Sequence, residues 1–394
     1  MPVIAAAILS SEDVTLKNLP YLQDITTMFE LIGSMGADIS LDEKMNFKLN
    51  TSNLSNLEAR YELVKTMRAS ILVLGSMIAR YGYAKIALPG GCAIGSRPVN
   101  YHLKALEKLG AKISLNNGYI EAKAEKLVGA EIEFEGVTVT GTENLMMAAS
   151  MAEGVSKLTN VAKEPEISDL ADFLNSMGAN ISGAGTDEIR IEGVKELRGT
   201  TFEIPADRIE AGTYLVAAAL TNGKIRIKKI DASRMGAVIE TLQKAGAEVI
   251  SNDNSISLDM TNNIIKPVDI ITAPFPGFPT DMQAQFTVLN CIGDGKSHVQ
   301  ETIFENRFMH IQELNRMGTD ITINGTTAVI NGVDSISGAQ VMATDLRASA
   351  SLILAGLVAK GETLVDRIYH IDRGYERIEE KLSSLGAEIL RLPN

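Results

Sequence analysis

The fold of this chain is decided by a stretch that ends in a glycine turn, Val238-Ile239-Glu240-Thr241-Leu242-Gln243-Lys244-Ala245-Gly246-Ala247-Glu248-Val249-Ile250. Its apolar residues recur at helical spacing before the glycine, and a short β-type run follows it. The pattern occurs six times in the 394 residues, with the turn glycines between 68 and 74 residues apart. We therefore expect one structural unit repeated six times. The turn glycines are Gly36, Gly110, Gly178, Gly246, Gly318 and Gly386.

A second helix is predicted in each repeat, upstream of the amphipathic one. It is apolar on nearly all sides, as in Leu215-Val216-Ala217-Ala218-Ala219-Leu220, and should be buried all round. Strands and helices alternate, which indicates an α/β fold. Three repeats in each half predict an N-terminal domain, residues 1–205, and a C-terminal domain, residues 206–394, each with helices inside and sheet outside. A ligand is expected in the cleft between them.

The composition limits the kind of partner. The chain has 37 Lys and Arg against 49 Asp and Glu, a net charge of −12, which argues against nucleic acid or an anionic membrane. No apolar run reaches the roughly 18 residues of a membrane span. Two cysteines and four scattered histidines predict neither a disulfide framework nor a metal site. We expect a cytoplasmic protein that binds anions only through a local arginine cluster.

Short polar segments precede the buried helices and contain the first candidate functional residues. Glu143 and Asp207 lie in such segments, where an acidic side chain either caps the helix or has a functional role, and both alternatives stay open. Arg68 and Arg347 lie in equivalent places, but arginine does not suit capping there. For these two we favour a position facing an anion, or in a salt bridge, over an exposed surface position.

The second repeat departs from the others by a glycine-rich insertion. From the glycine before its strand to its turn glycine it takes 28 residues, where the later repeats take 23 to 25. The extra residues fall in Pro89-Gly90-Gly91-Cys92-Ala93-Ile94-Gly95-Ser96-Arg97-Pro98, and such loops are often functional. Cys92 is predicted to be reactive, since the glycines supply no core around it and an arginine stabilises a thiolate. Cys291 lies in an apolar run and is predicted to be a core residue.

Arg373 is a further candidate for anion binding. It lies beside Gly374, ahead of the last amphipathic helix, where the backbone has the freedom to present a guanidinium to a ligand. With Arg68 and Arg97 it would form a clamp for phosphate and carboxylate groups.

Five long motifs resemble one known group of enzymes. They are the segments Leu88–Pro98, Pro279–Gln285, Phe304–His310, Ala343–Ser349 and His370–Tyr375. In these motifs the chain is similar to the UDP-N-acetylglucosamine 1-carboxyvinyltransferases, which belong to the enolpyruvyl transferase family. The similarity extends from Pro2 to the C-terminus.

The resemblance implies a two-domain inside-out α/β barrel of six units, three per domain, that closes on UDP-N-acetylglucosamine and then phosphoenolpyruvate. It implies that the sugar 3-hydroxyl adds to C2 of phosphoenolpyruvate while C3 is protonated, and that the intermediate then loses phosphate, without a cofactor. This reaction is the first committed step of peptidoglycan synthesis, which links it to cell wall biogenesis, cell shape and cell division.

The resemblance also implies roles for particular residues. Cys92 would donate a proton, carry a covalent phosphoenolpyruvate adduct and be the target of fosfomycin. Asp281 would take or orient the 3-hydroxyl proton, and Arg373 would bind phosphoenolpyruvate as the third catalytic residue. The residues implied to bind substrates are Arg68, Arg97, Pro98, Val99, Asn100, Tyr101, Asp281, Ile303, Asp345 and Arg347, with residues 137–139 adjacent.

Two departures from the family pattern leave alternatives open. Position 100 is Asn, where many relatives have Asp near the uracil, which should alter one hydrogen bond. The family also has a further segment at the front, with a Lys-Asn pair whose lysine contacts phosphoenolpyruvate. The alternatives are therefore a working transferase and a sugar-nucleotide-binding protein with impaired catalysis. A third is the related shikimate-pathway enolpyruvyl transferase, which should not carry the cysteine loop.

Overall fold

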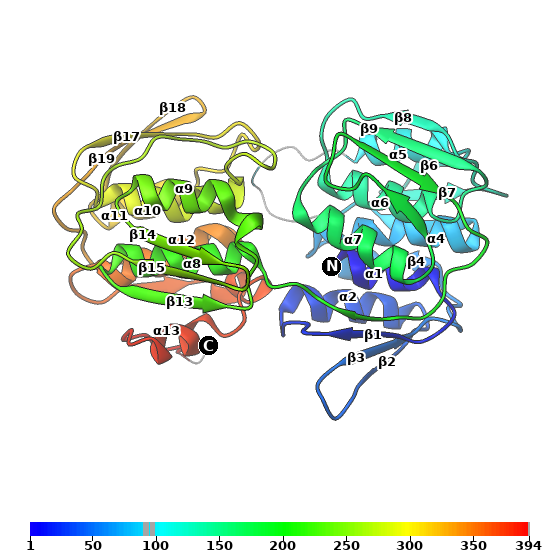
Figure 1. Ribbon diagram of the computed structural model, residues 1–394, viewed down its shortest axis with the longest axis horizontal. Coiled ribbons are helices and arrows are strands. Elements are labelled where there is room, and N and C mark those ends of the chain that lie inside the picture. Colours follow the sequence, from blue (N-terminus) through cyan, green and yellow to red (C-terminus); the bar gives the residue numbers. More distant parts are fainter. Residues whose placement is uncertain (90–93, 95–98, 393–394) are drawn as a thin grey trace. The chain divides into compact units, whose positions relative to one another are not determined.

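The computed structural model describes residues 1–89, 94 and 99–392. The chain forms two compact units, each with its own hydrophobic core (Figure 1). Unit 1 contains the described residues up to Pro205 except Ile94. Unit 2 contains Ile94 and the described residues from Ala206 onward.

Six amphipathic helices occupy the predicted positions and end in the same way. Each turn glycine has a φ between 89° and 110°, a conformation that glycine adopts without strain. The backbone N–H of the next residue donates to a carbonyl in the last turn of the helix, as from Ala247 to Leu242 at 3.0 Å. The six repeats are thus confirmed. The helices are α2 (Gln23–Ser34), α5 (Asn100–Lys108), α7 (Pro165–Ser176), α9 (Gly236–Lys244), α11 (His310–Arg316) and α13 (Ile378–Ser384).

Six apolar helical segments form the centres of the two units. They are α1 (Pro2–Ala6) with η1 (Ala7–Leu9), η2 (Arg68–Leu72) with α4 (Val73–Tyr81), α6 (Val139–Ala149), α8 (Arg208–Leu220), η4 (Thr280–Met282) with α10 (Gln283–Cys291), and α12 (Leu346–Val358). In α8 every residue from Ala211 to Leu220 is buried. In unit 1, α4 packs against α1 and α6, and in unit 2 α8, α10 and α12 pack against one another. These helices are inside the units, as the apolar pattern predicted.

Unit 1 has three four-stranded sheets of one design. A strand pairs antiparallel with a hairpin, and a short strand from another repeat pairs in parallel with its other edge. The strand orders are β12-β1-β3-β2, β4-β5-β7-β6 and β8-β9-β11-β10. The bounds are β1 (Val14–Lys17), β2 (Asp38–Leu41), β3 (Phe47–Asn50), β4 (Glu58–Ala59), β5 (Tyr83–Ala87), β6 (Lys112–Asn116), β7 (Tyr119–Lys123), β8 (Glu131–Glu133), β9 (Val155–Thr159), β10 (Asn180–Ser182), β11 (Glu188–Glu192) and β12 (Thr201–Glu203); a short helix, α3 (Tyr61–Val64), follows β4. Because β12 pairs with β1, the third repeat is linked back to the first.

Unit 2 follows the same design less completely. Its sheets are β13-β15-β14, β16-β17-β19-β18 and β20-β21. The bounds are β13 (Lys224–Lys228), β14 (Glu248–Asn252), β15 (Ser255–Asp259), β16 (Ile270–Ile271), β17 (Lys296–Gln300), β18 (Asp320–Asn324), β19 (Thr327–Asn331), β20 (Gln340–Met342) and β21 (Leu364–Asp366), with the short helices η3 (Ala232–Met235) and η5 (Ile368–Arg373).

The sixth repeat has no strand after its turn glycine in the part of the chain that the structure describes, so the prediction of a β-type run is wrong there. Side-chain ion pairs hold this segment in place of a sheet. Arg391 donates to both carboxylate oxygens of Asp372 at 2.7 and 3.0 Å and to both of Glu379 at 2.7 and 3.1 Å. These bonds attach the segment to η5 and α13.

Asp207 and Glu143, the two acidic residues predicted near helix starts, have different positions. Asp207 caps α8, since its carboxylate accepts hydrogen bonds from the N–H groups of Ile209 at 2.7 Å and Glu210 at 3.1 Å. The capping alternative is wrong for Glu143, because α6 begins four residues earlier, at Val139. Glu143 is instead a buried residue of α6, 4% exposed.

The stability of unit 1 is expected to fall with rising pH because of Glu143. Burial raises the pKa of this carboxyl to about 8, with the Met1 amino group opposing the shift and Glu166 and Glu164 adding to it. The folded state holds the proton more tightly than the unfolded chain. The stabilising contribution is therefore complete below about pH 4.5 and is lost as the pH rises to about 8.

Urea unfolding at pH 6 and pH 9 measures this effect. One pKa unit corresponds to about 1.4 kcal/mol, so a loss of more than about 1 kcal/mol is expected over this interval. Glu143→Gln cannot titrate and should show a flatter dependence on pH. Equal pH dependence in the two proteins would contradict the assignment.

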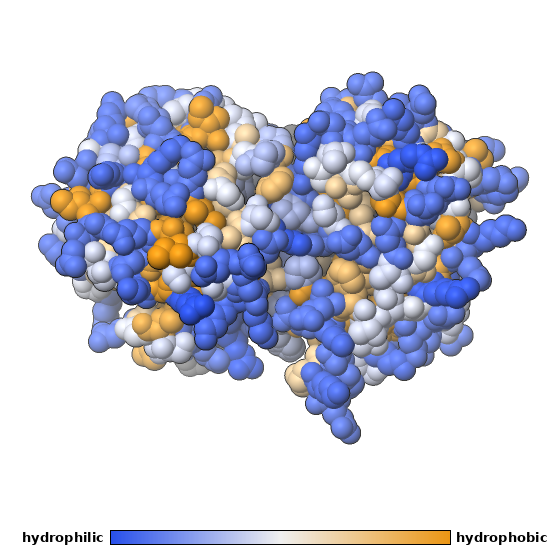
Figure 2. All heavy atoms as spheres, in the orientation of Figure 1, coloured by the Kyte–Doolittle hydropathy of each residue, from blue (hydrophilic) through white to orange (hydrophobic). Residues whose placement is uncertain are grey.

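The surface is largely polar. Hydrophilic residues cover most of the face of each unit that Figure 2 shows, and apolar residues occur there in separate patches. Within the described residues, no helix is long and apolar enough to cross a membrane.

Candidate active site

Asp281 lies at the centre of an ion-pair network in unit 2. It is the second residue of η4, where the buried segment that continues as α10 begins. Its Oδ1 accepts a hydrogen bond from Arg307 at 2.8 Å, and its Oδ2 accepts one from Arg347 at 3.0 Å. The side chains of Arg307 and Arg347 are 5% and 11% exposed, whereas that of Asp281 is 39% exposed. An accessible carboxylate is therefore held by two buried guanidinium groups.

The two arginines keep this carboxylate charged. Burial alone would raise the pKa of Asp281, but the charges of Arg347 and Arg307 and their hydrogen bonds outweigh it and hold the pKa well below its usual range. A carboxylate in this state accepts a hydrogen bond strongly but holds a proton poorly. It suits the orientation of a hydroxyl better than proton storage.

Arg347 has donor atoms beyond those that Asp281 uses. Its Nη2 binds Asp281, but its buried Nε and Nη1 have no hydrogen-bond partner among the described residues. The guanidinium lies over the ring of Tyr375, 5.4 Å from the centroid, and the Tyr375 hydroxyl bonds to Thr213 at 2.8 Å. Buried polar atoms are rarely left unpaired in folded proteins. The two nitrogens are therefore placed to bind an anionic ligand.

Asp345 and Arg373, two other predicted residues, are close to one histidine. Asp345 is 3% exposed and caps α12, accepting a hydrogen bond from the N–H of Arg347 at 2.9 Å. Burial lowers the pKa of His370, the charge of Arg373 lowers it further, and Asp345 opposes the shift. Because both residues act on His370, the structure brings Asp345 and Arg373 into one neighbourhood, and the cap places Asp345 beside Arg347.

In unit 1, Arg68 lies near His102. This histidine is 1% exposed, and its Nδ1 and Nε2 lie 2.9 Å from the Asn144 amide nitrogen and 3.3 Å from the Thr140 hydroxyl. The Asn144 amide nitrogen can only donate, so Nδ1 is the acceptor and Nε2 carries the proton. Burial, and the charge of Arg68 after it, lower the pKa of His102 to about 4. A neutral histidine therefore links α5 to α6 beside Arg68.

Val99, Asn100 and Tyr101 form the start of α5. Val99 is half-buried and Asn100 is exposed. The Tyr101 ring lies against Gly136, where a Cβ would come within 3.2 Å of the tyrosine hydroxyl. Gly136 leads directly into residues 137–139, so two segments predicted to bind the sugar nucleotide lie side by side in unit 1.

Cys92, Arg97 and Pro98 lie outside the described residues. Two residues of the site were missed in the sequence. Arg307 belongs to a quoted motif, and its position beside Phe308 in an apolar context was a usable signal. His102 lies on the buried face of an amphipathic helix, with Leu106 one turn further on. A polar residue on such a face needs a buried partner, which was the signal there.

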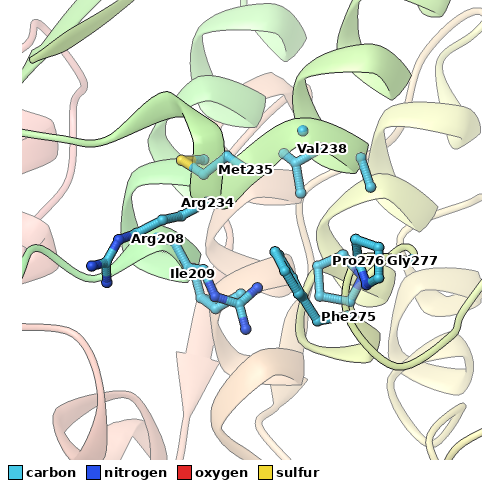
Figure 3. Close-up of a pocket in the computed structure, with 11 residues that line it drawn as sticks. Arg208, Ile209, Arg234, Met235, Val238, Phe275, Pro276 and Gly277 are labelled. Carbon is cyan, nitrogen blue, oxygen red and sulfur yellow. The ribbon is translucent and has the colours of Figure 1, made fainter. Parts of the chain in front are cut away.

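A pocket adjoins the Asp281 segment (Figure 3). Arg208 follows Asp207 directly, and Pro279 lies two residues before Asp281. The guanidinium of Arg208 lies 5.8 Å from the centroid of the Phe275 ring. The pocket is lined by Arg208, Ile209, Arg234, Met235, Gly236, Ala237, Val238, Phe275, Pro276, Gly277 and Pro279.

Comparison with known proteins shows the family. The family model described as EPSP synthase (3-phosphoshikimate 1-carboxyvinyltransferase) matches residues 1–382. The chain belongs to the EPSP synthase family. Two relatives of this EPSP synthase-family chain carry the name UDP-N-acetylglucosamine 1-carboxyvinyltransferase. The protein from Hydrogenovibrio crunogenus is 58% identical over 391 residues, which cover 99% of this chain and 94% of the relative. The protein from Coxiella burnetii is 57% identical over 393 residues, which cover 100% and 91%.

Solved structures share the fold. The enolpyruvyl transferase NikO from Streptomyces tendae matches this EPSP synthase-family chain with a TM-score of 0.88 and 23% identity, over 98% of this chain and 92% of that one. An EPSP synthase from Acinetobacter baumannii matches with a TM-score of 0.74 and 17% identity, over 100% and 95%. The predicted α/β fold is thereby confirmed.

Proposed function

We propose that this chain transfers the enolpyruvyl group of phosphoenolpyruvate to the 3-hydroxyl of UDP-N-acetylglucosamine and releases phosphate. The observation that carries the proposal is the network of Asp281, Arg307 and Arg347. It combines an accessible carboxylate for a hydroxyl with two unpartnered guanidinium nitrogens for an anion. The 58% identity to a relative named UDP-N-acetylglucosamine 1-carboxyvinyltransferase supports the sugar nucleotide as acceptor.

The proposed reaction is an addition followed by an elimination. The sugar O3 bonds to C2 of phosphoenolpyruvate while C3 takes a proton from Cys92, which gives a tetrahedral intermediate that still carries phosphate. Loss of a proton from C3 and cleavage of the bond between C2 and the phosphate oxygen then yield the enol ether and inorganic phosphate. Asp281 accepts the hydrogen bond of the 3-hydroxyl and directs its oxygen. Arg347, Arg373 and Arg97 bind the anionic groups where negative charge develops.

We assign the remaining substrate contacts to particular segments. In unit 1 they are Arg68, residues 97–101 and residues 137–139, all of which we assign to the sugar nucleotide. In unit 2 they are Ile303 and Asp345. The pairing of Tyr101 with Gly136 and of Arg68 with His102 supports the unit 1 assignment. We take the two units as the two predicted domains.

Phosphate release by the purified chain tests the proposed function. Release is expected when UDP-N-acetylglucosamine and phosphoenolpyruvate are both present, and none is expected with either alone. Absence of release with both substrates, under conditions where the sugar nucleotide binds by calorimetry, would instead support a binding protein with impaired catalysis. Release with shikimate 3-phosphate in place of the sugar nucleotide would favour the shikimate-pathway reaction.

Cys92→Ser is expected to abolish a covalent adduct with phosphoenolpyruvate, because a hydroxyl is a far weaker nucleophile than a thiolate. Intact mass after incubation with phosphoenolpyruvate measures the adduct. Cys291→Ala is the matched control. Burial raises the pKa of the Cys291 thiol to about 12, so this residue should not react and the control should keep the adduct. An adduct that survives Cys92→Ser would place the nucleophile elsewhere.

We place the reaction in the cytoplasm. The chain has two cysteines, and Cys291 is a free buried thiol, which is typical of a reducing compartment.

A further inference from the structure

Glu301 is a buried carboxylate that joins three segments of unit 2. It follows β17 and is 2% exposed. Its Oε1 accepts hydrogen bonds from the Thr272 hydroxyl at 2.8 Å, the Ile303 N–H at 2.8 Å and the Phe304 N–H at 3.2 Å. Its Oε2 accepts one from the Thr280 hydroxyl at 2.8 Å. All four donors therefore depend on one side chain.

These donors belong to segments that the proposed function uses. Ile303 is assigned to the sugar nucleotide, and its backbone N–H is bound directly by Glu301. Thr280 is the residue before Asp281 and the first residue of η4. One oxygen of Glu301 thus holds the loop that contains Ile303, and the other holds the turn that presents Asp281.

The Thr272 segment strengthens the same loop. The Thr272 hydroxyl accepts a hydrogen bond from the Thr302 N–H at 2.9 Å, and the Thr302 hydroxyl donates to the Thr272 carbonyl at 2.6 Å. Thr272 lies next to β16, which pairs with β17. The loop is therefore anchored to the edge of a sheet, and Glu301 is the connection from that anchor to Asp281.

We propose that Glu301 is a positioning residue that holds the Ile303 loop and the Asp281 turn in one fixed relation. The inference rests on the proposed function, because it concerns the alignment of the sugar 3-hydroxyl with Asp281. A displacement of about 1 Å in an aligned site can cost about 10²-fold in rate. Loss of Glu301 should therefore weaken sugar-nucleotide binding through Ile303 and slow turnover through Asp281.

Two variants of Glu301 separate positioning from bulk packing. Glu301→Ala removes all four acceptor contacts and is expected to raise KM for UDP-N-acetylglucosamine at least about tenfold and to lower kcat at least about tenfold. Glu301→Gln keeps one oxygen for Ile303, Phe304 and Thr272, and its amide can donate to the Thr280 hydroxyl. This conservative variant should recover most of the activity, to within about fivefold of wild type.

Asn290→Ala is the matched control. Asn290 is fully buried on α10 and makes two hydrogen bonds of 2.9 Å with Val268, away from Asp281 and Ile303. The control should lower the melting temperature as Glu301→Ala does but leave KM and kcat unchanged below the transition. Equal effects of both variants on KM and kcat, or none from Glu301→Ala, would overturn the proposal.

Thr280→Val tests the Asp281 connection without removing the buried carboxylate. It deletes one donor and should lower kcat several-fold with little change in KM for the sugar nucleotide. An unchanged kcat would overturn this part of the proposal. If the wild-type chain shows no turnover, the proposed function fails by itself. Calorimetry with UDP-N-acetylglucosamine then still decides whether Glu301→Ala weakens binding, which the positioning role requires.

Discussion

Replacing Asp281 by asparagine is expected to lower kcat by roughly 10³-fold while UDP-N-acetylglucosamine still binds with nearly unchanged affinity. Arg347 and Arg307 hold the pKa of Asp281 well below its usual range, so the carboxylate is a charged acceptor for the 3-hydroxyl. An amide oxygen is a weaker acceptor. The amide nitrogen would also face one of the two guanidinium groups, which have no acceptor to offer it.

The same replacement is expected to destabilise unit 2. The partners Arg307 and Arg347 are 5% and 11% exposed, and removal of one member of a buried ion pair typically costs about 3–5 kcal/mol. Turnover therefore has to be measured well below the melting temperature of the variant, with unfolding followed in parallel. The pH–rate profile of the wild type should show no titration of Asp281 between pH 5 and pH 8, since an orienting carboxylate with this pKa stays charged there.

Asp269→Asn is the matched control for this prediction. Asp269 is a carboxylate of the same unit, its side chain is 72% exposed, and it accepts a hydrogen bond from the His298 N–H at 2.7 Å. Turnover and unfolding should both stay close to wild type in this variant. A kcat of Asp281→Asn within about tenfold of wild type would remove Asp281 from the proposed mechanism.

Arg347→Met is expected to raise KM for phosphoenolpyruvate by about 10²-fold or more, because two hydrogen bonds from a charged donor contribute about 1.5–3 kcal/mol each. The buried Nε and Nη1 have no partner among the described residues, so their loss should affect the ligand more than the fold. Arg347→Lys keeps the charge but lacks the planar fork, and it should recover only part of the affinity. Steady-state kinetics at saturating UDP-N-acetylglucosamine measures both variants.

Arg316→Met is the control for the loss of a cation from unit 2. The Arg316 side chain is 63% exposed and lies 3.9 Å from Glu313, an arrangement that contributes little to stability. Its KM for phosphoenolpyruvate should match the wild type. A wild-type KM in Arg347→Met would show that the two nitrogens serve no phosphoenolpyruvate group.

The helices were predictable because their signals are local. The turn glycine and the apolar spacing before it lie within one helix length, and all six helix ends carry the same hydrogen bond as in Ala247 to Leu242. Two local predictions failed. Glu143 lies inside α6 because the helix begins four residues earlier, at Val139, and residues 387–392 form ion pairs through Arg391 where a strand was expected.

The candidate site was predictable in part. Asp281 and Arg347 were found through motifs and through the departure of arginine from the capping pattern, and the structure joins them at 3.0 Å. Arg307 was not assigned a role, although it binds the same carboxylate at 2.8 Å. Glu301 carried no signal at all, because a glutamate after a strand reads as an exposed residue unless its four donors are known.

By itself the sequence determined the six repeats, the α/β class and the residue types available for anion chemistry, because helical periodicity and glycine turns act over a few residues. Only the tertiary structure decided which charges meet. Asp281 is 26 residues from Arg307 and 66 from Arg347, and Glu301 is 29 from Thr272. Contacts over such separations depend on how the repeats pack, and it is that packing which buries the arginines and thereby sets the charge of Asp281.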